Sequence, residues 1–240
     1  MKNVQLSAKL DREIQVFIQK LKNSYSDDLL SVILYGSAAS GEFIEKHSNL
    51  NILIVLKSMK LAALKKSSAI VNKSVNLTPL FLTEKYIHSS TDIFPIEFLD
   101  MQENYSVLYG KDVLKDIPID SKNLRFQCEQ ELKAKLINLK QLYIRLNANP
   151  RALRELLLKS FTSILHILRN VLRLKGVQPS YKKEDLLKEL AGHFKIELSH
   201  WEKILRAKLK KVKINKAQAE ELFVTFIGNL EEIVETVDAL

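Results

Sequence analysis

The feature that most limits how this chain can fold is a change in its hydrophobic pattern near residue 120. Before that point, apolar residues come in short runs rich in β-branched side chains, such as residues 51–56, which are typical of buried strands. After it, they recur at helical spacing over long stretches such as residues 121–147, which is typical of helices that bury one face. We therefore predict two domains: residues 1–120 form an α/β domain, and residues 121–240 form an all-helical bundle.

The predicted elements alternate in the first half of the chain and are all helical in the second. Helix is predicted where apolar residues fall on one face, and strand where a short apolar run ends at a turn residue. In the first half the predicted strands are 29–35, 51–56, 79–82 and 93–99, and the predicted helices are 5–24, 58–75 and 84–88. In the second half the predicted helices are 121–147, 150–175, 183–194, 197–210 and 216–239.

The composition points to a soluble, cytoplasmic protein. Cys128 is the single cysteine, so no disulfide can form within the chain, which fits a reducing compartment. The first residues carry charges where a signal peptide needs an apolar core, and no apolar run approaches the length of a membrane span. We expect no membrane partner.

The positive charge of the chain is confined to its second half. Residues 1–120 hold 14 Lys and Arg against 14 Asp and Glu, whereas residues 121–240 hold 23 against 14. Such an asymmetry can mark a surface that binds phosphates or nucleic acid. The alternative is a lysine-rich helical surface that simply faces water, and the densest basic run, residues 206–216, is open to both interpretations.

The segment from Val32 to Val55 contains the most informative motif. A buried strand runs into Gly36-Ser37, and a helix that begins at Ser37 would leave free backbone N–H groups that attract an anion. Gly36 allows a sharp turn and a close approach of the backbone to a ligand. The next strand opens with Asn49 and Asn51, which alternation places on one face. This arrangement predicts a site for the phosphates of a nucleotide; the alternative is a strand–turn–helix connection with a polar edge.

These residues resemble the nucleotidyltransferase superfamily of the DNA polymerase beta type. That family has a Gly-Ser turn, then about ten residues, then Asp-x-Asp at the start of a strand. The matching residues here are Leu34-Tyr35-Gly36-Ser37, Gly41-Glu42 and Ser48, with Asn49 and Asn51 at the two aspartates. The family's third acid lies on a neighbouring strand, and Glu97 is the candidate here. The resemblance covers roughly residues 28–115 and implies a mixed sheet, with the later helices as a partner domain.

The resemblance implies Mg²⁺-dependent transfer of a nucleotidyl group from a nucleoside triphosphate. In that chemistry two aspartates and a third acid hold two metal ions, which clamp the attacking and leaving oxygens. Mg²⁺ prefers charged oxygen ligands, and an asparagine offers one neutral carbonyl. At an effective dielectric constant of about 20, each lost pair of unit charges about 4 Å apart forfeits about 4 kcal/mol.

We therefore predict a nucleotidyltransferase-type protein with impaired catalysis, because Asn49 and Asn51 replace the metal-binding aspartates. It would bind a nucleotide, or act as a regulatory module. One alternative is an active Mg²⁺-dependent transferase that modifies a small molecule or a protein and uses Glu97 with other acids. The other alternative is a nucleic-acid-binding module built on the basic helical half.

Overall fold

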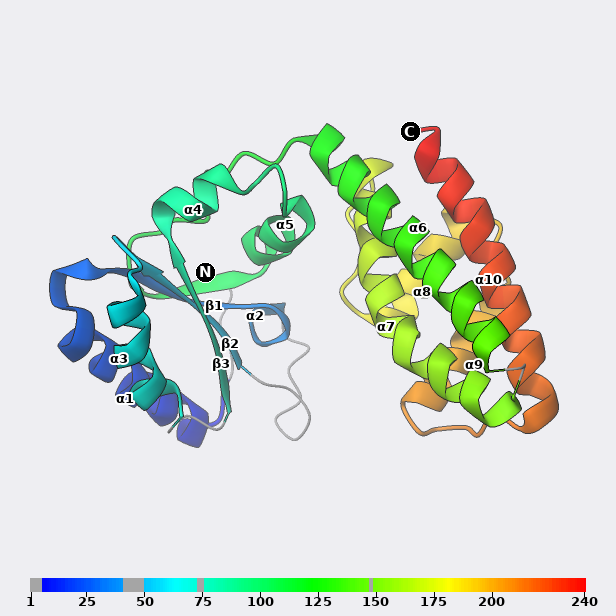
Figure 1. The fold of residues 1–240 in the computed structure, drawn as a ribbon, viewed down its shortest axis with the longest axis horizontal. Coiled ribbons are helices and arrows are strands. Elements are labelled where there is room, and N and C mark those ends of the chain that lie inside the picture. Colours follow the sequence, from blue (N-terminus) through cyan, green and yellow to red (C-terminus); the bar gives the residue numbers. More distant parts are fainter. Residues whose placement is uncertain (1–5, 41–49, 73–75, 147–148) are drawn as a thin grey trace. The chain divides into compact units, whose positions relative to one another are not determined.

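The computed structural model describes residues 6–40, 50–72, 76–146 and 149–240 (Figure 1). The chain divides into two compact units, Met1–Asp120 and Ser121–Leu240. Among the residues that the structure describes, no helix has both the length and the apolar character needed to cross a membrane.

The first unit is built on a four-stranded mixed sheet. Its strands are β1 (Leu29–Tyr35), β2 (Leu50–Leu56), β3 (Leu77–Thr83) and β4 (Tyr105–Gly110), in the order β3-β2-β1-β4. β1 runs antiparallel to both of its neighbours, whereas β2 and β3 are parallel. The two central strands are buried on both faces, which explains their nearly unbroken apolar sequences. The mixed sheet that the resemblance implied is confirmed.

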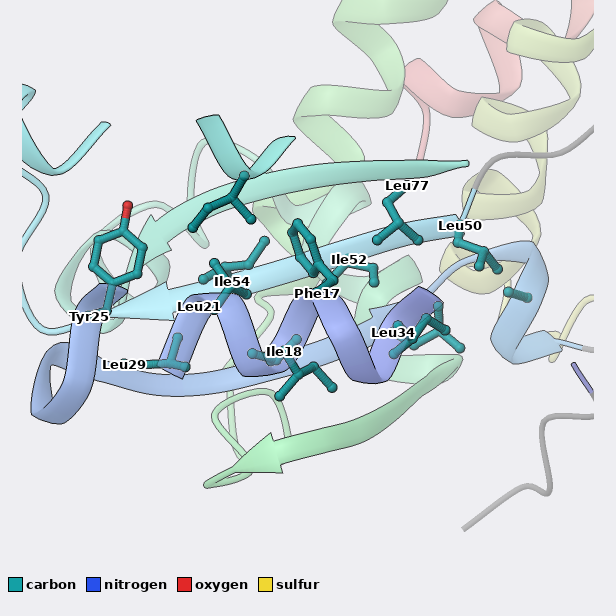
Figure 2. Close-up of a cluster of buried hydrophobic side chains, with 14 of the residues drawn as sticks. Phe17, Ile18, Leu21, Tyr25, Leu29, Leu34, Leu50, Ile52, Ile54 and Leu77 are labelled. Carbon is teal, nitrogen blue, oxygen red and sulfur yellow. The ribbon is translucent and has the colours of Figure 1, made fainter. Parts of the chain in front are cut away.

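One face of the sheet is covered by α1 (Ala8–Tyr25) and α3 (Leu61–Val71) (Figure 1). α1 begins after Ser7, whose hydroxyl accepts a hydrogen bond from the backbone N–H of Leu10 and so caps the helix. The apolar stripe predicted for this helix is buried, and Figure 2 shows Phe17 and Leu21 packed over Ile52 and Ile54 of β2. This face is therefore a closed apolar core.

The opposite face packs against α4 (Glu84–Ser89), α5 (Pro95–Glu103) and the segment that follows β4. Leu53 and Val55 of β2 point into this second core, where they meet Phe98 of α5 and Ile87 of α4. Because side chains alternate along a strand, Asn51 belongs to this face as well.

Two sequence predictions in this region are wrong: residues 93–99 do not form a strand, and Glu97 therefore does not lie on a strand. Residues 93–99 were expected to form a strand, but Pro95 begins helix α5, where its missing N–H costs nothing. Pro95, Phe98 and Met101 are buried at a spacing of three, which is the spacing of one helix face. Over so few residues this helical period is hard to distinguish from the alternation of a strand. The fourth strand is instead β4, and Glu97 therefore lies in the first turn of a helix.

The second unit consists, over its described residues, of five helices: α6 (Ser121–Arg145), α7 (Pro150–Leu174), α8 (Lys183–His193), α9 (Leu198–Lys208) and α10 (Lys216–Asp238). α7 packs against all four of the others and is buried along most of its length. Asn149 caps α7 ahead of Pro150, and Asn215 forms a capping box with Gln218 at the start of α10. An all-helical unit thus follows the α/β unit, and the predicted fold class is confirmed.

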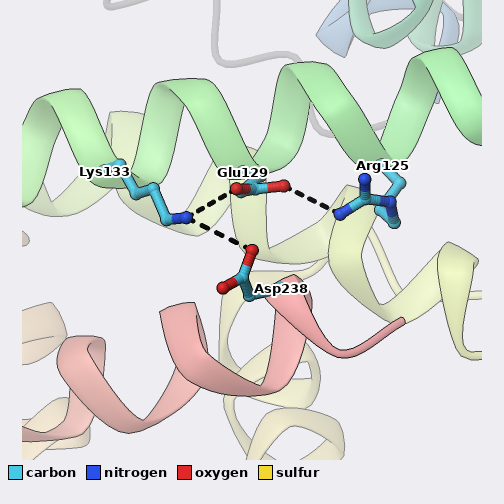
Figure 3. Close-up of polar contacts among 4 residues, drawn as sticks. All are labelled: Arg125, Glu129, Lys133 and Asp238. Atoms are coloured by element: carbon cyan, nitrogen blue, oxygen red, sulfur yellow. Dashed lines mark hydrogen bonds and ion pairs between the residues drawn. The ribbon is translucent and has the colours of Figure 1, made fainter.

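A cluster of charged side chains joins α6 to α10 (Figure 3). Glu129 accepts hydrogen bonds from Arg125 at 2.7 Å and from Lys133 at 2.6 Å, and Lys133 also pairs with Asp238 of α10 at 3.3 Å. The hydrogen bond from Lys133 lowers the pKa of Glu129 and raises that of Lys133. The cluster links the two long helices through an exposed ion pair, which contributes little to stability.

Candidate functional site

The turn after β1 holds the first two predicted site residues. Gly36 has a φ of +78°, a conformation that glycine adopts without the strain of a side chain. Its N–H donates to the carbonyl of Asn104 at 3.2 Å, and its carbonyl accepts from Ala39 at 2.9 Å, which closes the first turn of α2 (Ser37–Ser40). The sequence prediction of a strand, a glycine turn and a helix beginning at Ser37 is confirmed.

Asn51, the third predicted residue, packs directly against this turn. A Cβ atom placed on Gly36 would lie 3.0 Å from the side-chain nitrogen of Asn51. The Asn51 side chain is half-buried at the second position of β2. The structure therefore brings the glycine turn and the amide together, while Asn49 lies outside the described residues.

Asn51 belongs to a row of polar side chains that crosses the sheet. Its Cα partners are Thr78 on β3 and Tyr35 on β1, and Tyr35 pairs in turn with Tyr105 on β4. Cross-strand partners point to the same face of a sheet, about 5 Å apart. We call Thr78, Asn51, Tyr35 and Tyr105 the polar row; it lies on the face that α4 and α5 cover, at the end of the sheet where β1 enters the Gly36 turn.

The two tyrosines of the polar row stay protonated at neutral pH. Burial raises the pKa of the Tyr35 phenol. Burial, together with a hydrogen bond to Asp112 and the charge of that carboxylate, raises the pKa of Tyr105 to about 12. The Tyr105 hydroxyl donates to Asp112 at 2.7 Å, and Asp112 also accepts from the N–H groups of Leu114 and Lys115. Asp112 is thus engaged in shaping the chain after β4.

Glu97, the residue predicted as third acid, is not part of the polar row. It is exposed on α5, next to the buried Phe98, and Asp100 follows one turn later on the same helix. The strand that neighbours β2 and follows it in sequence is β3, whose residue beside Asn51 is Thr78. All four strands of the sheet lack charged residues, as their sequences show.

Sequence reasoning did not identify Thr78, Tyr35 or Tyr105 as site residues, although Tyr35 is part of the matched Leu34-Tyr35-Gly36-Ser37 segment. Alternation alone places Thr78 on the same face as Leu80, and Tyr35 on the same face as Ile33, once the face of each strand is known. What the sequence does not contain is the register between strands that lie far apart in the chain. The partner of Asn51 on β3 follows from that register alone.

The structure also places the single cysteine, the single tryptophan and the densest basic run of the chain. Cys128 is fully buried in α6, and Trp201 is fully buried between α7, α9 and α10. Residues 206–216 are mostly exposed at the end of α9 and in the connection to α10. Within the described ranges, no three His, Cys, Asp or Glu side chains come together as a metal-binding group.

Comparison with known proteins gives likenesses to two proteins whose names refer to adenylyl transfer. No family model matches the sequence. A candidate protein adenylyltransferase of Methanocaldococcus jannaschii is 25% identical over 111 residues, which are 43% of this chain and 74% of that protein. The crystal structure of a spectinomycin adenyltransferase from Enterococcus faecialis with ATP and spectinomycin matches with a TM-score of 0.56 at 13% identity. That match covers 92% of this chain and 98% of the other, so the fold is shared across both units.

Proposed function

We propose that this chain, a member of the nucleotidyltransferase superfamily by the fold and resemblance described above, binds a nucleotide with its phosphates at the Gly36 turn and is impaired in two-metal catalysis. The observation that carries this proposal is the position of Asn51. The resemblance assigns an aspartate there, and the structure packs the neutral amide against the glycine turn. Such a protein would serve as a nucleotide-binding or regulatory module.

The turn itself supports nucleotide binding. The chain leaves β1 at Gly36 and enters α2 at Ser37, and the first backbone N–H groups of a helix have no partner within it. The Gly36 N–H is itself engaged with the carbonyl of Asn104, so the phosphates of a nucleotide would meet the N–H groups that follow it. Gly36 keeps the backbone open there, because a Cβ atom would crowd the side-chain nitrogen of Asn51 at 3.0 Å. The spectinomycin adenyltransferase that shares this fold was crystallised with ATP, which favours a nucleotide as the ligand class.

The neutral side chains argue against efficient transfer. Two-metal catalysis depends on carboxylates that hold both ions between the attacking and leaving oxygens. Asn51 offers one amide oxygen and Thr78 one hydroxyl, and each 1.36 kcal/mol of lost transition-state stabilisation slows the reaction about tenfold. Asn49, which lies outside the described residues, removes a second charge of the Asp-x-Asp pattern.

A transfer assay tests this proposal directly. Incubated with α-labelled nucleoside triphosphates and millimolar Mg²⁺, the purified protein should bind nucleotide in a calorimeter yet label itself, added proteins or small acceptors very slowly or not at all. Robust Mg²⁺-dependent labelling that disappears in Glu97→Ala would contradict the impaired function. It would instead support the second candidate.

That second candidate is an active Mg²⁺-dependent nucleotidyltransferase. It is favoured by the names of both matched proteins, which refer to adenylyl transfer, and by the acids of α5 on the face of the sheet that carries the polar row. In this case Glu97 and Asp100 would supply the metal ligands. The third candidate, a nucleic-acid-binding module, would show RNA or DNA binding that weakens steeply with salt.

Replacing Gly36 with valine should abolish nucleotide binding. The new side chain would stand in a left-handed conformation that β-branched residues rarely adopt, with its Cβ 3.0 Å from the Asn51 amide. Gly36→Ala should show the same effect to a smaller degree. The measurement is ATP affinity by calorimetry, with circular dichroism to verify folding.

Gly176→Val is the matched control for this experiment. Gly176 has a φ of +76°, but nothing lies within 4 Å of its Cβ position, and it follows the C-cap of α7 in the helical unit. It introduces the same backbone strain and should leave ATP affinity unchanged. Unchanged affinity in a folded Gly36→Val protein would exclude the turn as the phosphate site.

A further inference from the structure

The residues beside the Gly36 turn do not suit a magnesium ion. Mg²⁺ is held in proteins by carboxylates in octahedral geometry and gives up its water reluctantly. Here the side chains of the polar row are an amide and hydroxyls, and the strands that carry them contain no Asp or Glu. The donor set therefore disagrees with the metal that the superfamily resemblance implies.

The same residues suit a direct contact with phosphate. An asparagine amide carries two N–H donors, and threonine and protonated tyrosine each carry one O–H donor. Asn51 touches Gly36, Thr78 is exposed beside it on β3, and Tyr35 adjoins it on β1. Asn51 thus lies next to the backbone turn, and Tyr35 and Thr78 are its cross-strand neighbours on either side. A carboxylate in any of these positions would repel phosphate oxygens unless a cation stood between them.

We propose that this site binds the phosphates of a nucleotide without a divalent cation, through the Gly36 turn and the neutral side chains of Asn51, Thr78 and Tyr35. The inference rests on the nucleotide binding proposed above and specifies how that binding is achieved. In this arrangement the substitutions of the metal-binding acids replace the metal ion with hydrogen-bond donors. Phosphate recognition through a metal ion is replaced by recognition through direct hydrogen bonds. A protein that no longer transfers a nucleotidyl group would therefore still bind the nucleotide.

The test compares ATP affinity in excess Mg²⁺ with affinity in EDTA. The unmodified protein should give dissociation constants that agree within about twofold in the two buffers. Asn51→Asp should bind at least about tenfold more weakly in EDTA, because its carboxylate faces the phosphates, and should recover affinity when Mg²⁺ is added. Thr78→Asp should also weaken ATP binding in EDTA. Because Thr78 is exposed, a carboxylate at this position should not disturb folding in the way that a buried one would.

Asn23→Asp provides a matched control. Asn23 is exposed on α1, which covers the opposite face of the sheet, and its side-chain oxygen accepts from Gln19, a hydrogen bond that aspartate retains. This variant adds the same charge to the same unit and should leave ATP affinity unchanged in both buffers.

The possible outcomes separate the two proposals. ATP binding only in the presence of Mg²⁺ would overturn cation-independent recognition and leave nucleotide binding in place. An absence of ATP binding in both buffers would overturn both proposals. Equal affinity of Asn51→Asp and the unmodified protein in EDTA would remove Asn51 from the phosphate contact and so contradict the inference.

Discussion

Replacing Gly110 with alanine is expected to destabilise the α/β unit by about 2–5 kcal/mol. Gly110 ends β4 with a φ of +78°, and a Cβ atom there would lie 2.0 Å from the backbone carbonyl oxygen of Leu30 on β1. Left-handed backbone costs an alanine about 1–2 kcal/mol, and forced overpacking typically costs about 1–3 kcal/mol. The obstacle is backbone rather than a flexible side chain, so the two strands must separate to relieve it.

Urea denaturation followed by circular dichroism measures this loss, and two other glycines separate its causes. Gly176→Ala has the same left-handed strain with no contact within 4 Å, so it should lose only about 1–2 kcal/mol. Gly192→Ala lies inside helix α8 with open space around it and should gain about 0.5–1 kcal/mol. If Gly110→Ala lost no more than Gly176→Ala, the close approach of β4 to β1 would be refuted.

The sheet could be predicted from sequence where its strands are buried on both faces. β1 and β2 are nearly continuous runs of Val, Ile and Leu, and their predicted bounds agree with the structure within one residue. β3 was also predicted, although its observed range, Leu77–Thr83, is longer at both ends. Complete burial leaves a strong signal in composition, because almost every position must be apolar.

β4 and α5 could not be predicted because their signals are local and weak. β4 lies at the edge of the sheet, and its residues are half-buried or exposed, so Tyr105–Gly110 has no long apolar run. α5 spans nine residues, too few to distinguish its helical period from alternation, and the apolar residues around Pro95 suggested a strand. The packing of α5 onto the sheet decides its conformation, and that contact is absent from the local sequence.

The sequence was enough to predict the turn of the candidate site, but not the residues on neighbouring strands that lie beside Asn51. The Gly36 turn and the face of Asn51 follow from the order of residues along one hairpin-like segment. The neighbours of Asn51 follow from the parallel pairing of β2 with β3, which a helix separates in the sequence. Glu97 was therefore chosen as third acid from a strand that does not exist, and the structure places Thr78 beside Asn51 instead.

The second large effect is expected in the helical unit, where Trp201→Ala should cost about 3–5 kcal/mol. Trp201 is fully buried, with its ring centroid 4.8 Å from that of Phe226 and 5.8 Å from that of Phe161. These three side chains come from α9, α10 and α7, so truncation opens a cavity where three helices meet. It also removes the indole N–H that donates to Asn229 at 3.0 Å.

Trp201→Phe divides this loss into its two parts. Phenylalanine keeps most of the contact with Phe161 and Phe226 but loses the hydrogen bond to the half-buried Asn229, so a loss of about 1–3 kcal/mol is expected. Val224→Ala, at a position 56% exposed on α10, should change stability by about 0.5 kcal/mol or less. Because Trp201 is the single tryptophan, urea transitions must be followed by far-ultraviolet circular dichroism. A Trp201→Ala loss as small as that of Val224→Ala would show that the helices do not depend on this aromatic contact for their packing.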